Sequence, residues 1–296
     1  MLFAISVRSI LAAASMAVAA LAVQAQELRP WMHPEIAEAW QQGFKGQNTT
    51  VTFVDDFNGT TRLSGILGDA TEAHTHGEWT SMETGMLATD ASVSRHDFSN
   101  TSAVTLVGGR LNTLNLSYGM MAQAGYSRMR WNSRESSIIA AARRATAVVV
   151  KSAGNDGVAI ATVNKSGKLD YLSRDLIGAD TAIFVGALTA HGTVENPTSM
   201  AWYSNYAGSN TMVQSHFLVV GVPGNLTGLQ GTSFAAPAVS AYAAILGSKF
   251  ASATPHEITS QLLNTARSDT IRSFAPNIHG RGEASILRAL APDMIR

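Results

Sequence analysis

Among the residues of this 296-residue chain, Asp55, His76 and Ser233 are of the three types that nucleophilic hydrolysis requires, and they occur in that order. A serine hydroxyl becomes a good nucleophile when a histidine removes its proton, and a carboxylate can hold that histidine in the required tautomer. Each residue also has an ordinary explanation. A serine at a helix start is usually an N-cap, and an aspartate shortly before Asn58-Gly59 suits a turn. The residue types alone therefore do not decide whether these three residues have a catalytic role or a purely structural one.

The serine lies in the segment Gly231–Pro237, which reads GTSFAAP. The glycine lets the backbone turn sharply and lets a ligand approach closely. If Ser233 opens a helix, its N–H has no helical partner, and the positive helix end can stabilise an anion. Pro237 is tolerated in a first helical turn, where N–H groups lack partners anyway. The segment therefore suits a nucleophile displayed at the start of a helix.

The same segment closely resembles GTS-x-[AS]-x-P, the serine motif of subtilisin-like proteases, the subtilase family. Val51–Asp56, which reads VTFVDD, resembles the family strand that ends in the triad aspartate, with Asp55 preferred to Asp56. His76 is followed by glycine, as in the family, whereas the rival His74 is not. The order Asp, His, Ser is that of subtilisin. The resemblance extends over essentially the whole chain after its first 25 residues and implies the triad Asp55, His76 and Ser233.

Two further segments resemble the family's oxyanion and substrate segments. Val148–Gly157 reads VVVKSAGNDG, and the resemblance makes Asn155 the side-chain donor to the oxyanion, beside Ala153 and Gly154. The ordinary alternative is a Gly-Asn-Asp-Gly turn. Leu114–Gly119 reads LNLSYG, and the resemblance places Ser117, Tyr118 and Gly119 along the first specificity pocket. The alternative there is an ordinary strand end.

The resemblance implies a serine endopeptidase that hydrolyses peptide bonds through an acyl-enzyme. Two alternatives stay open: a catalytically inactive subtilase-like protein that binds peptides or proteins, and a processing protease with one narrow substrate. After His76-Gly77, where the family commonly has Thr, His and Val, this chain has Glu78, Trp79 and Thr80, so the neighbouring subsites differ.

The surrounding pattern predicts the elements that must position these residues. Short apolar runs alternate with helical stretches, which is typical of βαβ units and a mostly parallel sheet buried on both faces. We therefore expect an α/β, subtilisin-like three-layer fold. The predicted strands are Thr50–Val54, Ala103–Val107, Thr113–Leu116, Ala147–Ser152, Ala182–Ala187 and Phe217–Val220. The predicted helices are Glu35–Gln42, His76–Thr89, Glu135–Thr146, Ser233–Ser248 and Pro255–Thr265.

One stretch departs from the family order of strand, helix and strand. Only Gly108–Asn112 separates the predicted strands Ala103–Val107 and Thr113–Leu116, and a parallel crossover needs about a dozen residues. The helix is therefore missing, and this part of the sheet must be rearranged. One option is that the two runs form a single bent strand.

The N-terminus reads as a signal peptide, residues 1–25, followed by one peptidase domain, residues 26–296. Arg8 precedes the apolar run Ile10–Val23, and small residues precede a cleavage site after Ala25. The alternative is a membrane anchor, for which the run is short. We expect a secreted protein, periplasmic or extracellular, with no membrane contact in its mature form. About thirty residues lie between Gln26 and Asp55, too few for a folded propeptide, so a folding helper or inhibitor supplied in trans is one option.

Composition narrows the partners. The formal net charge is zero, which gives no electrostatic reason to expect nucleic acid, so the expected partner is a peptide or protein substrate. There is no cysteine, which excludes disulfides and thiolate metal sites. We expect no cofactor and no metal ligand. Calcium is common in the family, but no calcium-loop pattern occurs, so no ligands are assigned.

Overall fold

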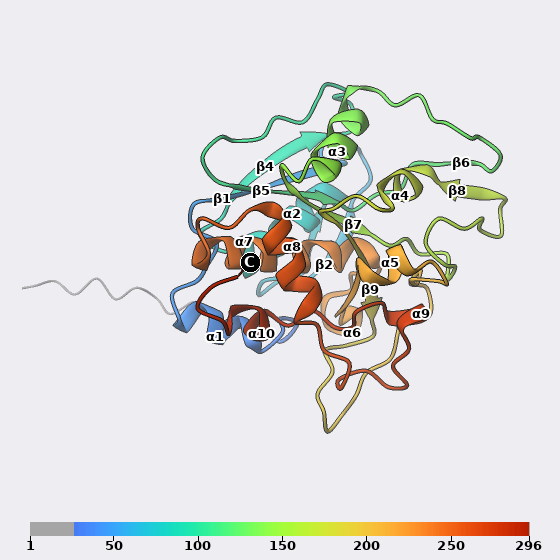
Figure 1. The fold of residues 1–296 in the computed structure, drawn as a ribbon. Coiled ribbons are helices and arrows are strands. Elements are labelled where there is room, and N and C mark those ends of the chain that lie inside the picture. Colours follow the sequence, from blue (N-terminus) through green and yellow to red (C-terminus); the bar gives the residue numbers. More distant parts are fainter. Residues whose placement is uncertain (1–26, 296) are drawn as a thin grey trace, which may run out of the picture.

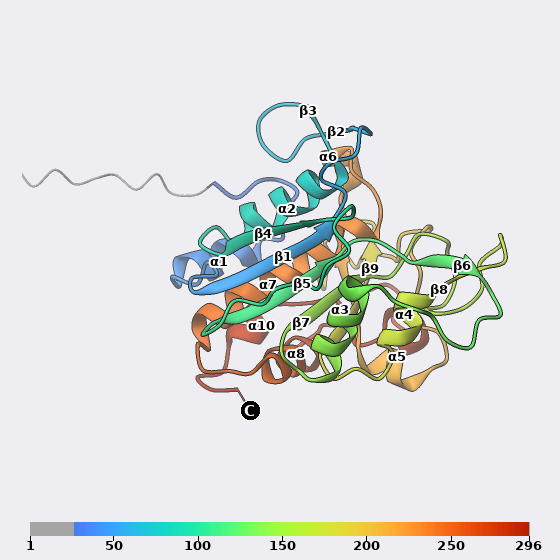
Figure 2. The same ribbon diagram turned by 90° about the horizontal axis from the view of Figure 1, so that it is seen from above.

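The computed structural model describes residues 27–295, and a six-stranded sheet lies at its centre (Figures 1 and 2). The strand order is β10-β9-β7-β5-β1-β4, and every neighbouring pair is parallel. The strands are β1 (Thr49–Asp55), β4 (Ser92–Asp97), β5 (Leu111–Leu116), β7 (Val148–Ser152), β9 (Ala182–Leu188) and β10 (Phe217–Gly221). Parallel strands end at the same edge of the sheet, so the residues that follow them gather there.

Helices cover both faces of this sheet, which confirms the predicted three-layer α/β fold (Figures 1 and 2). Side chains alternate along β7, so Val148 and Val150 enter one hydrophobic core and Val149 enters the other. The first core packs against α1 (Glu35–Gln41), α2 (His76–Leu87), α7 (Ala236–Lys249), α8 (Pro255–Asn264) and α10 (Ile286–Leu290). The second packs against α3 (Ser133–Arg143), α4 (Tyr171–Leu176) and α5 (Thr211–Ser215). Burial on both faces explains why these strands are apolar runs.

The long helix α7 lies close against the sheet because its sequence supplies small residues. Most of its positions are buried, and many are alanine. A Cβ added to Gly247 would lie 2.5 Å from Leu111 Cδ2 of β5, so glycine is required at this approach. The helix therefore fixes the segment before it, which carries Ser233, against the strand ends.

The prediction of a strand at Ala103–Val107 is wrong, and so is the option of one bent strand. That segment is irregular, and the sixth strand is β4, which pairs with β1 at the edge of the sheet. The chain then returns to β5 through residues 98–110. These residues contain no helix, as was predicted from the short spacing of the apolar runs. β4 is polar and mostly exposed, so it lacks the apolar run on which strand prediction depends.

The other strand and helix predictions agree with the structure to within a few residues, with one correction at Ser233 described below. Two short antiparallel pairs were not predicted: β2 (Leu63–Gly65) with β3 (Glu72–His74), and β6 (Met121–Gln123) with β8 (Lys168–Asp170). The remaining short helices are α6 (Gly224–Thr227) and α9 (Pro276–His279).

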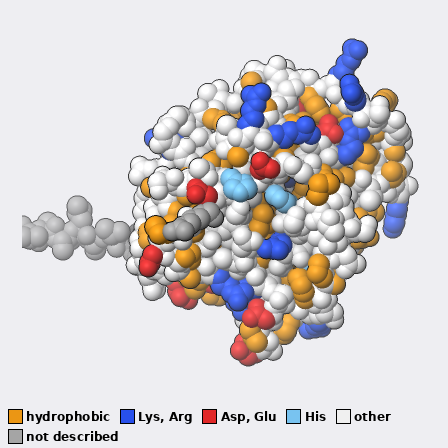
Figure 3. Space-filling view, in the orientation of Figure 1, with side chains coloured by type: hydrophobic (Ala, Val, Ile, Leu, Met, Phe, Trp, Pro, Cys, Tyr) orange, Lys and Arg blue, Asp and Glu red, His pale blue; other side chains and the backbone are white. Residues whose placement is uncertain are grey.

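Charges are interspersed over the face drawn in Figure 3, without one large field of a single sign. The predicted signal peptide lies outside the described residues. Within residues 27–295, no helix has both the length and the apolar character needed to cross a bilayer.

Candidate active site

Asp55 and His76 are joined by a short hydrogen bond. Asp55 is the last residue of β1, and His76 is the first residue of α2. The distance from His76 Nδ1 to Asp55 Oδ1 is 2.6 Å, and the aspartate is fully buried. The Thr80 hydroxyl donates to the other carboxylate oxygen at 3.0 Å. Because Nδ1 faces a carboxylate, it carries the ring proton, which leaves Nε2 with its lone pair for a substrate or nucleophile.

The start of α2 is fixed by a capping box. Thr75 is the N-cap: its hydroxyl accepts from the Glu78 N–H, and the Glu78 carboxylate accepts from the Thr75 N–H. These hydrogen bonds lower the pKa of Glu78. Gly77 lies against the end of β1, where an added Cβ would be 2.9 Å from Asp56 O. The glycine after His76 therefore allows the helix start to approach the strand that carries Asp55.

The rival residues have structural roles. His74 Nε2 lies 2.8 Å from Glu72 Oε2 on the exposed hairpin β2–β3. The Asp56 carboxylate accepts from the Gly59 N–H at 2.7 Å and so forms a turn. The structure therefore favours Asp55 and His76 as the interacting pair.

Ser233 lies in the 3₁₀ turn Thr232–Phe234, and α7 begins only at Ala236. The prediction that Ser233 opens the helix is therefore corrected: Gly231, with φ of 121°, turns the chain into a tighter first turn. The Ser233 hydroxyl donates to Ser117 O at 3.1 Å, and the Ser117 hydroxyl donates to Ser233 O at 2.9 Å. Within the described residues, the Ser233 hydroxyl is thus hydrogen-bonded to the backbone carbonyl of Ser117 and not to the His76 ring.

The His76 ring nevertheless lies beside the Ser233 segment. Its centroid is 5.9 Å from the ring centroid of Phe234. Asp55, His76 and the segment that carries Ser233, which are far apart in the sequence, thus lie at the same edge of the sheet.

The Asn155 side chain is anchored through its oxygen. Its Oδ1 accepts from the Thr232 N–H at 2.9 Å and from the Thr232 hydroxyl at 3.0 Å. The Gly154 N–H in turn donates to the Thr232 hydroxyl at 3.0 Å. Since the oxygen is engaged, the amide NH₂ is the part of Asn155 available to a ligand.

A pocket of about 230 Å³ opens beside Ser233 and Asn155. It is lined by all five residues predicted to bind substrate: Ser117, Tyr118, Gly119, Ala153 and Gly154. Its other lining residues include Met121, Val158, Ala159, Ala161 and Thr162, and also Lys151, Asp170 and Ser173.

Lys151 and Asp170 form an ion pair in this pocket that sequence reasoning missed. Lys151 Nζ lies 3.1 Å from Asp170 Oδ2 and donates to Ser152 O at 2.7 Å. Burial opposes ionisation of Asp170, but the Lys151 ammonium and several hydrogen bonds lower the pKa of its carboxyl. A lysine within the apolar run of a buried strand was the available signal, because buried lysines need a partner.

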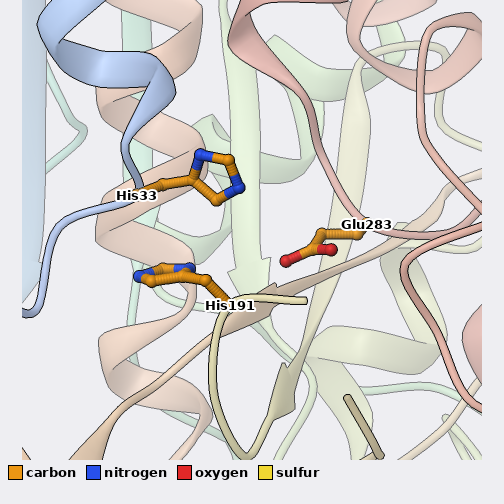
Figure 4. A group of neighbouring side chains, drawn as sticks. All are labelled: His33, His191 and Glu283. Atoms are coloured by element: carbon orange, nitrogen blue, oxygen red, sulfur yellow. The ribbon is translucent and has the colours of Figure 1, made fainter. Parts of the chain in front are cut away.

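Away from this pocket, three titratable side chains of the described residues lie close enough together to hold a metal ion. His33, His191 and Glu283 have ligand atoms within 4.8 Å of one another (Figure 4). His191 Nε2 donates to Trp31 O at 2.8 Å, and the Glu35 N–H donates to His33 Nδ1 at 3.2 Å. A neutral His33 therefore carries its proton on Nε2, so this nitrogen has no free lone pair for a metal in that tautomer. We assign no metal to this group, and the expectation of a protein without cofactors stays a prediction.

The sheet order, the two helical layers and the site at the carboxyl ends of the strands are those of an α/β protein of the subtilisin-like class. The chain belongs to the Subtilase family, whose model matches residues 57–282.

Solved structures show the same fold at low sequence identity. The prenylagaramide maturation protease PagA is similar over 88% of this chain and 98% of its own chain, with a TM-score of 0.56 and 18% identity. A protease from Pseudoalteromonas arctica is similar over 87% and 93%, with a TM-score of 0.54 and 18% identity. MycP1 from the ESX-1 type VII secretion system is similar over 88% and 85%, with a TM-score of 0.53 and 19% identity. No curated protein sequence matches significantly.

Proposed function

We propose that the chain is a serine endopeptidase with Ser233 as nucleophile, His76 as general base and Asp55 as its orienting partner. The observation that carries the proposal is the 2.6 Å hydrogen bond between buried Asp55 and His76, at the sheet edge that also holds Ser233. Membership of the Subtilase family supports a serine-type peptidase. The substrates are peptides or proteins.

The proposed reaction begins with rotation of the Ser233 hydroxyl from Ser117 O toward His76 Nε2. Catalytic hydrogen bonds of this kind often form only when substrate is bound. His76 takes the hydroxyl proton as the oxygen attacks the scissile carbonyl, and Asp55 stabilises the imidazolium. The Asn155 NH₂ and the Ser233 N–H donate to the oxyanion. His76 then protonates the leaving amine, and water releases the acyl group by the same steps.

One observation favours the alternative, an inactive subtilase-like binding protein. The Ser233 hydroxyl donates to Ser117 O, and a serine held there is not activated by histidine. The pocket beside it would then bind a peptide without cleaving it.

A fluorophosphonate probe separates the two functions, because it reacts with activated serines. We expect it to label the purified chain that starts at Gln26 and not its Ser233→Ala variant, with equal circular dichroism spectra showing that both fold. Casein cleavage then distinguishes broad from narrow specificity. A folded parent that stays unlabelled would falsify the protease proposal and support the binding protein.

Secretion and processing are part of the same proposal. We infer that residues 1–25 are a signal peptide, so that the mature chain begins at Gln26. N-terminal sequencing of the exported protein tests this, and a chain that retains Met1 in the membrane fraction would point to an anchor. A helper or inhibitor acting in trans stays a prediction, which co-purification from the secreting host would test.

A further inference from the structure

The pocket beside Ser233 is lined by two segments, 117–119 and 153–154, which we call its first and second walls. The ion pair Lys151–Asp170 connects these two walls. Asp170 lies against the first wall, since a Cβ added to Gly119 would be 3.2 Å from Asp170 Oδ2. Lys151 immediately precedes the second wall and donates to Ser152 O. The Asp170 side chain is 13% exposed and that of Lys151 only 1%. The carboxylate therefore faces the pocket, and the ammonium lies behind it.

The hydrogen-bonding capacity of Asp170 is already used. Its Oδ1 accepts from the N–H groups of Met120 at 2.9 Å and Leu172 at 3.2 Å. Its Oδ2 accepts from the Ser173 hydroxyl at 2.7 Å and pairs with Lys151 at 3.1 Å. A carboxylate has about four acceptor sites, so none remains for an arriving cation.

A charged side chain entering this pocket would gain no partner. An arginine or lysine would meet a saturated carboxylate with an ammonium behind it, and a glutamate would meet the like charge of Asp170. Burying a charge without a new partner is costly. By contrast, the walls contributed by Val158, Ala159 and Ala161 offer apolar contact to an uncharged side chain.

We propose that Lys151 is a specificity-determining residue: by neutralising Asp170, it makes this pocket select an uncharged residue, such as leucine, methionine or glutamine, on the amino side of the scissile bond. The inference rests on the proposed function. An aspartate in a specificity pocket usually attracts basic residues, as in trypsin, and here the lysine cancels that attraction.

The inference can be tested with peptidyl diphenyl phosphonates that differ only in the residue before the phosphorus. The rate at which each probe labels Ser233 then depends on how well that residue fits the pocket. We expect the parent to react at least about tenfold faster with leucine, methionine and glutamine probes than with lysine, arginine or glutamate probes, a difference that corresponds to about 1.4 kcal/mol. Lys151→Met keeps the length of the side chain and removes its charge. It should raise the arginine-to-leucine rate ratio at least tenfold.

Two further variants keep the outcome decisive. Lys151→Met/Asp170→Asn removes both charges and should keep the preference for uncharged probes. Asp170→Asn alone leaves the ammonium and should shift the preference toward glutamate. A parent that prefers arginine or lysine probes overturns the inference, as does a folded Lys151→Met variant with an unchanged ratio. Labelling of the parent by the non-selective fluorophosphonate shows that such a result concerns the pocket and not the nucleophile.

Discussion

At the scale of single residues, Asn155 is positioned by Thr232, the neighbour of the proposed nucleophile. Thr232 contacts the Asn155 oxygen twice, so the orientation of the amide is set before substrate arrives. A donor held in place needs no reorganisation when charge develops on the substrate oxygen. The contact also joins the proposed oxyanion donor directly to the segment that carries the proposed nucleophile.

The prediction at this scale concerns Asn155→Ala. We expect kcat to fall by about 10²–10³ with little change in KM, because the lost donor acts on the transition state and not on bound substrate. Steady-state kinetics on a cleaved peptide measure both constants. Thr232→Ser, which keeps the hydroxyl that holds Asn155, is the matched control and should stay close to the parent. An Asn155→Ala variant with parental kcat would remove Asn155 from the oxyanion site.

At the scale of elements, the start of α2 decides where His76 lies relative to Asp55. The chain contains a second capping box of the same type, Thr254 with Glu257, at the start of α8. That helix carries none of the proposed catalytic residues. The two helices thus allow a comparison between a cap next to a proposed catalytic residue, His76, and a cap that only stabilises a helix.

We predict that Thr75→Ala and Thr254→Ala each lower the free energy of unfolding by about 1 kcal/mol, the usual loss for an N-cap. Only Thr75→Ala should also slow fluorophosphonate labelling of Ser233, because it loosens the helix start that holds His76. Urea unfolding and labelling rates are measured for both variants, with Thr75→Ser as the conservative control. Equal labelling rates in the two alanine variants would show that the cap of α2 has no positioning role.

Prediction of these elements from sequence succeeded where burial on both faces produced apolar runs, as at Thr50–Val54 and Ala182–Ala187. It failed for β4, an edge strand whose side chains face solvent, so that neither an apolar run nor an alternating pattern marks it. The proposed catalytic residues could be selected because their motifs are local. Lys151 and Asp170 could not be paired in advance, since their contact depends on how β7 and β8 meet around the pocket.

At the scale of the whole molecule, His33, His191 and Glu283 join three distant parts of the chain: the segment before α1, the connection between β9 and β10, and the segment before α10 (Figure 4). Burial lowers the pKa of His33 and of His191 to about 4, helped by Arg267 beside the first and His33 beside the second. Burial raises the pKa of Glu283 to about 7. His191 Nδ1 and Glu283 Oε2 are buried without partners.

These shifts have opposite effects on stability. Between about pH 4 and 6.5 the unfolded chain protonates the two histidines and the folded chain does not, so their contribution to stability is lost as pH falls. Between about pH 4.5 and 7 the folded chain keeps a proton on Glu283 that the unfolded chain releases, so this contribution is lost as pH rises. The contributions of the two histidines thus oppose that of the single glutamate. Near pH 5.5 the cluster should therefore lower the free energy of unfolding by about 1.4 kcal/mol for each unit that pH falls.

The sign of each contribution can be tested separately by urea unfolding from pH 4.5 to 7, with all chains in a Ser233→Ala background to prevent self-cleavage. Glutamine cannot titrate, so His33→Gln and His191→Gln should each make stability less dependent on pH than in the background chain. Glu283→Gln should make it more dependent, because the opposing group is gone. A Glu283→Gln variant with a shallower dependence would mean that Glu283 is ionised in the folded chain throughout this range. The charge of Glu283 would then be compensated by the two histidines or by Arg267, whose positive charge favours the ionised carboxylate.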